Sequence, residues 1–441
     1  MPRDATILLL VLCTGCASYR PEPLPTTPSA TTRPPRVAPL RVSLDGATRG
    51  ELRVDLADGL GPDEAAVIAV LRNPDLIALR SSRGEAQAQV VAAGILPNPV
   101  LSGSFDHPFG VNSAGASNAW SVSLEMALKP FVARGAKRSA AKAGVTQIDL
   151  GIAWQEWVVA GQARLLVVRL GWLRRRLKLA REELDFQTHA ADSMKKASVA
   201  GDQTIDQVGV QVAAVENVRR TVNELEQTEL TSESDLIALL GEPNLERIQV
   251  ETPQDPKLAG GSFPSVSECL TRRIDIRALR YGYRSQDEAT RAAVLDQFPA
   301  VNVGISYQRD ETPLSFVGAF VSVELPVFDR NQAQVASAEA TRTRLMREYD
   351  ARVIATRVDI DRLSRFSTLI AKQLPAVRAA IPSLEAIESK EQAAVAEGNL
   401  SQLEYQTVRA ALLEQKLQEA ALSQALAEAR ITATNSCGGT G

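Results

Sequence analysis

The feature that most constrains the fold of this chain is a long stretch without proline, from Val132 to Ala200. Apolar side chains recur along it at the spacing of one face of an α-helix. A continuous helix of this length would extend for roughly 100 Å, far more than the helices of globular domains. Because its apolar stripe runs along the whole rod, the rod needs a partner along its whole length.

A reversal follows this stretch and provides that partner. Gly201 can end a helix in the left-handed conformation, and Asp202 or Thr204 can cap the next helix. The sequence therefore predicts a helical hairpin over residues 132–241, with Gly241 as its stop.

Composition suits long helices and excludes several kinds of function. Aromatic residues make up only 5 % of the 441 residues, and a net charge of −3 gives no basic field for nucleic acid. The two histidines and four cysteines show no metal-binding spacing. Cys269 and Cys437 are isolated in the sequence, so no disulfide framework is expected. We expect no enzyme activity, no catalytic residues, no metal and no cofactor, because no nucleophile–base set or phosphate-binding loop is visible.

The N-terminus has the pattern of an export signal followed by a lipid anchor. An apolar run too short to span a bilayer leads to the sequence LCTGCAS, which resembles a bacterial lipobox except that Cys13 replaces the usual leucine. The resemblance implies a signal peptide over residues 1–15, palmitate or another acyl chain on Cys16, and a proline-rich tether over 16–60. A cleaved signal peptide without lipid is the alternative. The anchor would place the chain at the outer membrane of a Gram-negative bacterium, extending into the periplasm.

After a helical segment, the hydrophobic period changes to two. Residues 100–108 and 117–126 are predicted to form a hairpin of strands about ten residues long, a length that crosses a bilayer as a tilted strand. One side of the second strand is mostly large and apolar, with Trp120, Val122 and Leu124. Trp120 and Tyr307 are candidates for an interfacial aromatic girdle.

The same order of elements starts again after a connector at residues 242–263. Asp75-Leu-Ile-Ala-Leu-Arg lines up with Asp275-Ile-Arg-Ala-Leu-Arg at an offset of 200 residues. Two further strands are predicted at 301–309 and 316–325, followed by a second helical hairpin over 331–430.

The chain is therefore predicted to contain a first repeat over 61–241 and a second repeat over 264–432, with a disordered tail over 433–441. Two prolines, Pro375 and Pro382, fall inside the second long helix and are expected to kink it without ending it.

Four strands in one chain cannot close a barrel. A lipid-facing sheet with open edges would leave backbone N–H and C=O groups unpaired in hydrocarbon, at several kcal/mol each, and single-chain barrels need about eight strands. A soluble sheet is the alternative, but helices of roughly 100 Å cannot wrap a small sheet. We therefore expect several chains to share one barrel, which the helices continue as a hollow coiled-coil tube.

The duplicated order, together with a set of punctuating motifs, resembles the TolC-like outer-membrane efflux proteins. The motifs are Asn73-Pro74-Asp75, Leu96-Pro97-Asn98-Pro99, Leu236–Gly241 and Glu324-Leu325-Pro326-Val327-Phe328. The chain is most similar to the lipoprotein branch that serves resistance-nodulation-division pumps. The resemblance implies a mainly α fold with a membrane β part, a homotrimer with a twelve-stranded β-barrel, and an α-helical barrel below it.

The resemblance also implies a function and partners. The implied function is the exit duct of a tripartite efflux system, which passively conducts small molecules or ions through the outer membrane. The implied partners are outer-membrane lipid, a periplasmic adaptor (membrane fusion) protein and an inner-membrane resistance-nodulation-division pump. The alternatives are a periplasmic adaptor or coiled-coil scaffold lipoprotein, and the exit duct of a type I secretion system.

By resemblance, the two reversals are the periplasmic tips that contact the adaptor. The tip residues are Gly201, Asp202, Thr204, Asp206, Gly398, Asn399, Ser401, Leu403 and Glu404. Asp206 and Glu404 are the candidate tunnel-mouth acids, because a ring of acids would favour cations. The alternative is that these residues only cap helices. Leu400 and Thr407 depart from the pattern of family members that hold the closed state with an ionic latch.

Other side chains of the first long helix are expected to be structural. Trp154, Trp157 and Trp172 are predicted to pack between helices, and Arg174-Arg175-Arg176 is predicted to lie on a solvated face.

Overall fold

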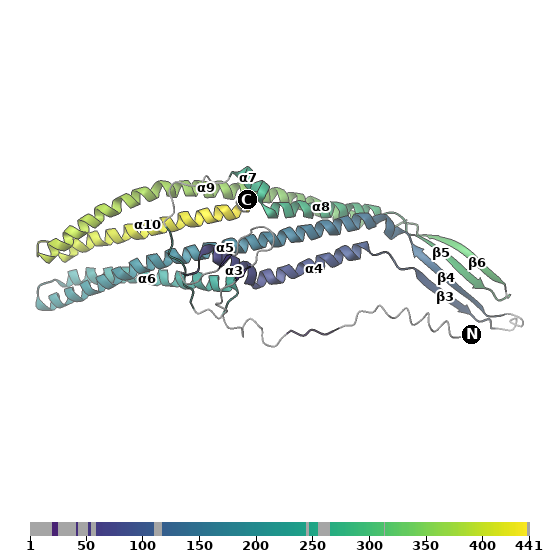
Figure 1. Cartoon of the computed structure of the whole chain (residues 1–441), viewed down its shortest axis with the longest axis horizontal. Coiled ribbons are helices and arrows are strands. Elements are labelled where there is room, and N and C mark those ends of the chain that lie inside the picture. The colour runs from purple at the N-terminus through teal and green to yellow at the C-terminus, as the bar shows by residue number, and fades with distance from the viewer. Residues whose placement is uncertain are drawn as a thin grey trace.

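A computed structural model describes most of the chain after residue 58. The described residues are 20–24, 41–42, 52–53, 59–109, 117–243, 247–254, 265–312 and 314–438. The predicted signal peptide and Cys16 lie outside them, as does most of the tether. The described body is long and narrow, with strands at one end and two helical reversals at the other (Figure 1).

Two runs of elements follow one another in the same order: two helices, two strands, a long helix and a return helix. The first run is α3 (Pro62–Arg72), α4 (Pro74–Gly94), β3 (Val100–Asp106), β4 (Ala119–Ala127), α5 (Lys129–Ala200) and α6 (Ile205–Leu240). The second run is α7 (Val266–Arg272), α8 (Ile274–Leu295), β5 (Val301–Arg309), β6 (Ser315–Val323), α9 (Gln332–Ala396) and α10 (Gln402–Ser436). A short pair, β1 (Arg41–Val42) and β2 (Leu52–Arg53), precedes both.

Helix α5 is the central rod of the body. It contacts α3, α4, α6, α8 and α10, so apolar residues are buried on several of its sides. Leu170 and Trp172 are fully buried within it, as predicted for the tryptophan. Helix α9 continues through Pro375 and Pro382 and is nearly as long. None of the described helices combines the length and apolar character needed to cross a membrane.

The four long strands form one antiparallel sheet in the order β3-β4-β5-β6, so the β4–β5 pair joins the two runs. Strand register gives the sheet two different faces, because paired residues share a face and neighbours along a strand alternate. The apolar face carries Leu101, Phe105, Trp120, Val122, Leu124, Val303, Ile305, Tyr307, Val317 and Val321. The serine face carries Ser102, Ser104, Ser121, Ser123, Ser306 and Ser322.

The apolar face is open to its surroundings. Exposed fractions reach 70 % for Leu101, 61 % for Ile305 and 83 % for Val317. A monomeric soluble protein rarely leaves a continuous apolar surface of this kind uncovered. The sheet therefore requires a partner or an apolar solvent on that face.

Two expectations about the C-terminal region are wrong. Cys269 and Cys437, expected to be unpaired, form a disulfide across a sequence separation of 168 residues. Helix α10 continues to Ser436 and Cys437 is buried, so residues 433–438 are ordered and only 439–441 fall outside the described residues. The physical reason is the same in both cases: the fold brings α7 against the end of α10, a long-range contact that gives the last turn a packed environment.

The arginine triplet of α5 also differs from expectation. Arg174 donates to Glu229 (2.8 Å), to Glu233 (2.9 Å) and to the backbone carbonyl of Ile248 (2.7 Å). Arg175 lies over the ring of Trp172 at 5.1 Å. The prediction of a solvated face is wrong for Arg174, because α5 has other elements on most of its sides, whereas Arg175 is exposed.

Candidate functional site

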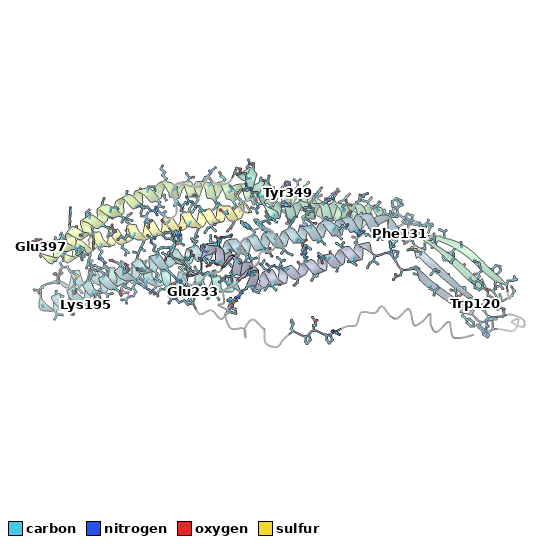
Figure 2. All side chains as sticks on the ribbon, viewed as in Figure 1. Trp120, Phe131, Lys195, Glu233, Tyr349 and Glu397 are labelled. Atoms are coloured by element: carbon cyan, nitrogen blue, oxygen red, sulfur yellow. A yellow bond between two sulfur atoms is a disulfide. The ribbon has the colours of Figure 1, made fainter. Side chains whose placement is uncertain are left out.

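The two helical reversals lie at the same end of the molecule, opposite the sheet (Figures 1 and 2). Lys195, near the α5–α6 reversal, and Glu397, at the α9–α10 reversal, mark this end in Figure 2, whereas Trp120 lies at the far end. The structure thus places at one end two turns that are far apart in the sequence, at Gly201 and Gly398.

The first reversal is built from a glycine cap and a capping box. Gly201 has φ +88°, and its amide donates to the Ser198 carbonyl (3.1 Å). Thr204 is the N-cap of α6. Its hydroxyl accepts from the Gln207 amide, and its own amide donates to the Gln207 side chain at 2.9 Å. Thr204 is therefore occupied as a cap, while Asp202 and Asp206 are exposed at the surface.

The second reversal repeats this construction with a carboxylate. Gly398 has φ +77°. The Ser401 hydroxyl donates to the Glu404 carboxylate at 2.7 Å, and the Glu404 amide donates back to that hydroxyl at 3.3 Å. Asn399 donates to Glu397 at 3.0 Å, and Leu403 lies in the first turn of α10.

The two candidate tunnel-mouth acids thus differ. Hydrogen bonds from the Ser401 hydroxyl and amide hold the pKa of the Glu404 carboxyl below its ordinary value. Glu404 is charged and bound to its own helix cap, whereas Asp206 stands exposed in the first turn of α6.

Two exposed apolar side chains at the first reversal were missed by sequence reasoning. Val199 is 92 % exposed and Ile205 is 82 % exposed, one on each side of the Gly201 turn. Branched aliphatic residues at such exposure favour burial against a partner. The signal was present in the sequence as apolar residues on both flanks of a polar turn.

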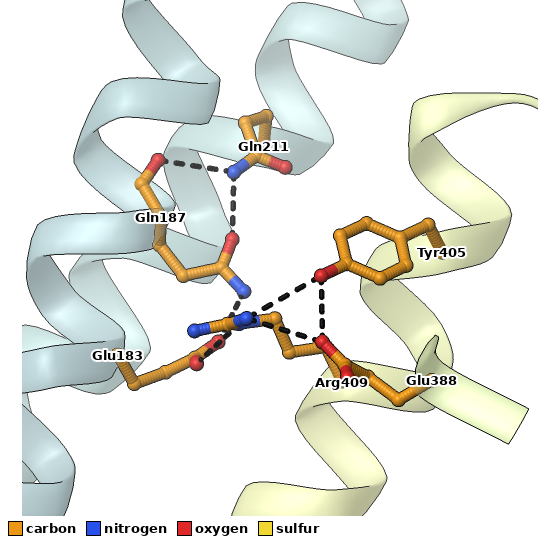
Figure 3. Close-up of polar contacts among 6 residues, drawn as sticks. All are labelled: Glu183, Gln187, Gln211, Glu388, Tyr405 and Arg409. Carbon is orange, nitrogen blue, oxygen red and sulfur yellow. Dashed lines mark hydrogen bonds and ion pairs between the residues drawn. The ribbon is translucent and has the colours of Figure 1, made fainter. Parts of the chain in front are cut away.

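Near this end, a polar cluster connects the two hairpins, and we call it the Arg409 cluster. It consists of Glu183 on α5, Glu388 on α9, and Tyr405 and Arg409 on α10 (Figure 3), together with Phe186 on α5. The Arg409 guanidinium donates to Glu183 at 2.9 Å and to Glu388 at 3.3 Å, and lies 3.6 Å from the centre of the Phe186 ring.

The members of the Arg409 cluster are held from several sides. The Tyr405 hydroxyl donates to Glu388 at 2.7 Å, and the Tyr405 ring meets Phe186 edge-on. Burial and the bond to Glu388 raise the pKa of the Tyr405 phenol, which keeps it a hydrogen-bond donor. Gln187 donates to Glu183 at 2.7 Å, and Gln211 of α6 donates to Gln187, so the network also includes α6.

This arrangement joins hairpins through charge rather than through an apolar seam. A cleft of about 370 Å³ adjoins the cluster and is lined by Glu182, Glu385 and Lys416 among others. Water can therefore reach its edge, which lowers the cost of separating the charges. Sequence reasoning missed the cluster because nothing local shows which face of α5 meets α10.

Among the residues that the structure describes, no three His, Cys, Asp or Glu side chains are placed to hold a metal ion. The geometry of this end is that of two capped turns and a charged contact between hairpins.

Comparison with known proteins bears on the identity of this architecture. Residues 265–439 match the model of a family described as outer membrane efflux protein. The outer-membrane channel OprN is 16 % identical with a TM-score of 0.72, over 97 % of this chain and 99 % of that chain. The CmeC outer membrane channel of Campylobacter jejuni is 14 % identical with a TM-score of 0.73, over 86 % of each chain.

A further similar structure is the MtrE outer membrane channel of Neisseria gonorrhoeae in its open state. It is 16 % identical with a TM-score of 0.69, over 86 % of this chain and 89 % of that chain. No curated protein gives a significant match.

These findings agree with the family resemblance that the motifs carry. The family match lies in the second run of elements, and the fold similarity spans both runs. Residues 265–439 thus match the outer membrane efflux protein family, and the chain as a whole has the fold of the outer-membrane channels OprN, CmeC and MtrE.

Proposed function

We propose that three copies of this chain form the exit duct, with three sets of four strands closing one twelve-stranded β-barrel. The observation that carries the proposal is the sheet itself, which has an exposed apolar face and ends on β3 and β6. In hydrocarbon, the outer backbone groups of both strands need partners. Pairing β6 of one copy with β3 of the next satisfies them all.

The two faces of the sheet support an orientation. The apolar face, with Leu101, Leu124 and Ile305 side by side, turns to the lipid. The serine face lines the lumen, where the hydroxyls of Ser104 and Ser121 lie 2.9 Å apart and can exchange hydrogen bonds with water. The internal duplication of the chain supplies each copy with two such hairpins.

The helices continue the barrel as an α-helical tunnel in the periplasm, and transport through it is passive. The energy comes from an inner-membrane pump of the resistance-nodulation-division type, through a periplasmic adaptor that docks at the tips. Val199 and Ile205 offer the adaptor an apolar contact beside the polar caps of Thr204 and Ser401. The Arg409 cluster fixes how far the second hairpin stands from α5. An acyl chain on Cys16 adds a second attachment to the outer-membrane lipid.

Two lysine substitutions on neighbouring residues of β5 test the sheet orientation. Ile305→Lys places a charge on the apolar face, at a cost of about 2–4 kcal/mol per copy near the middle of a bilayer. Ser306→Lys places the same charge on the serine face, where water is available. We expect Ile305→Lys to abolish outer-membrane trimers, and Ser306→Lys to assemble and reduce cation conductance in planar bilayers.

The contrasting results are equally informative. If Ile305→Lys assembled and Ser306→Lys did not, the faces would be assigned the wrong way round. If the parent protein and both variants were water-soluble monomers, the duct proposal would be refuted.

A further inference from the structure

The described residues contain two joints at which a return helix docks on the break between two earlier helices. At the first joint, the end of α6 docks between α3 and α4. Gly241, with φ +66°, lies so close to Arg72 that a Cβ would come 2.5 Å from its carbonyl oxygen. The Asn73 side chain donates to the Leu239 carbonyl at 3.1 Å.

The second joint has the same geometry, with the end of α10 docking between α7 and α8. Gly438, with φ +74°, lies against the backbone of Arg272 and Arg273, where a Cβ would come 3.2 Å from the Arg273 Cα. The Arg273 guanidinium donates to the Ser436 carbonyl at 3.2 Å. Each element of the first joint therefore has a counterpart in the second.

The joints differ in one pair of residues at the same place. In the first, Ala69 and Leu240 are buried in one apolar cluster. In the second, the matching residues are Cys269 and Cys437. The backbone carbonyls of Ala69 and Cys269 accept the hydrogen bond that closes the helix before the break. Leu240 and Cys437 each stand immediately before the glycine of their joint. Two residues of one apolar cluster in the first joint thus correspond to two covalently bonded cysteines in the second.

The first joint has two further contacts besides the buried Ala69 and Leu240. Arg72 forms an ion pair with Glu242, and Leu60 bridges to Val250 after the return helix.

We propose that Cys269 and Cys437 are a modification site, oxidised to a structural disulfide by a thiol–disulfide exchange protein of the periplasm. The location of this partner rests on the proposed function as an exported duct. The disulfide locks the base of the second hairpin at mid-length, where α7 meets the end of α10 (Figure 1). Motion of that hairpin is then confined to its tip.

The partner's own disulfide accepts the two electrons that oxidation of the two cysteines releases. One chain thiolate attacks a sulfur of that disulfide to form a mixed disulfide, and the second chain thiolate displaces the partner. Two electrons and, by exchange through water, two protons pass from the chain's thiols to the partner, which leaves as a dithiol.

Burial sets the order of events. Cys269 is fully buried and Cys437 is 3 % exposed in the folded chain, so a protein oxidant cannot reach either sulfur there. The exchange must come before the end of α10 docks. The disulfide then forms during assembly and is afterwards protected from reduction.

The test uses a variant that copies the first joint. Cys269→Ala with Cys437→Leu reproduces the Ala69–Leu240 contact without a covalent bond, so it separates the disulfide from packing. In the parent protein, mass spectrometry after alkylation of the unfolded chain should find both thiols blocked until a reductant is added. Heating with a reductant should lower the unfolding temperature of the parent by about 5 °C or more and leave that of the variant unchanged.

Cells that lack the periplasmic thiol oxidant should yield a chain with both thiols free. Alkylation of Cys269 or Cys437 in parent protein from oxidising cells, without reduction, would overturn the proposal, as would a parent unfolding temperature insensitive to reductant. Conductance of the same preparations in planar bilayers keeps the two proposals apart. Free thiols in a conducting duct overturn only the disulfide, and linked cysteines without any conductance overturn only the duct.

Discussion

Removal of the Arg409 guanidinium tests how the two hairpins are held together. Arg409→Met keeps most of the volume and the apolar stem of the side chain but removes both of its ion pairs. The Glu183 side chain, only 5 % exposed, is then left with the Gln187 amide as its partner. Glu388 keeps the Tyr405 hydroxyl.

The size of the effect follows from burial. Removing one partner of a buried ion pair typically costs about 3–5 kcal/mol, because a charge is left uncompensated. The Arg409 side chain is itself 26 % exposed and borders a cleft of about 370 Å³, so water compensates in part. We expect a loss of about 2–3 kcal/mol in local stability, which is roughly a hundredfold increase in local opening.

Hydrogen exchange on the detergent-solubilised assembly measures that opening directly. Backbone amides of α5 between Glu183 and Ala200 should exchange roughly a hundredfold faster in Arg409→Met. Adding Glu183→Gln should restore most of the protection, because no buried charge remains.

Lys416→Met is a matched control, because Lys416 pairs with Glu385 at 2.8 Å between α10 and α9 within one hairpin, and its side chain is similarly exposed at 34 %. It should leave exchange in α5 unchanged. Parent-like protection of α5 in Arg409→Met would refute the assignment of this cluster as a contact that stabilises α5 against the second hairpin.

Three further predictions concern the first joint, the second tip and the sheet. Asn73→Ala removes both the cap of α4 and the bond to the end of α6, so it should lower the free energy of unfolding by about 1–2 kcal/mol; an unchanged thermal unfolding curve would contradict this. The cap lowers the pKa of the Glu404 carboxyl, so its stabilisation of the tip is complete above the ordinary carboxyl pKa and is lost as the pH falls through the lowered pKa. Hydrogen exchange at the tip should therefore rise on acidification in the parent and not in Glu404→Gln. Gly304→Ala would bring a Cβ into the ring of Phe320 and to 2.8 Å from a backbone oxygen of β4, so it should reduce the yield of trimer; Gly103→Ala, whose Cβ would meet only an ordinary contact at 3.5 Å, is the control, and equal yields would count against the clash.

Features set by neighbours in sequence could be predicted. The alternation of Trp120, Val122 and Leu124 needs only a period of two, and β4 confirms it as a strand. The reversals follow from a glycine that adopts positive φ and from a hydroxyl residue that caps the next helix, and Gly201 and Gly398 confirm this geometry.

Features set by contacts between distant segments could not be predicted. The disulfide and the Arg409 cluster depend on which face of each rod meets which neighbour, and α5 has neighbours on several sides. The apolar stripe of a helix does not show which elements pack on its other sides, so Arg174 was predicted to be solvated although it is engaged in the fold. By contrast, the capping role of Glu404 depends only on Ser401, three residues before it, and could be predicted from the sequence.

The most direct test of the account is the number of chains in the native assembly. Native mass spectrometry of protein extracted from outer membranes in detergent should give three copies per particle, which conduct ions when placed in a planar bilayer. A folded monomer that stays in solution without detergent would contradict the account, because the open edges of β3 and β6 would then have no need of a second copy.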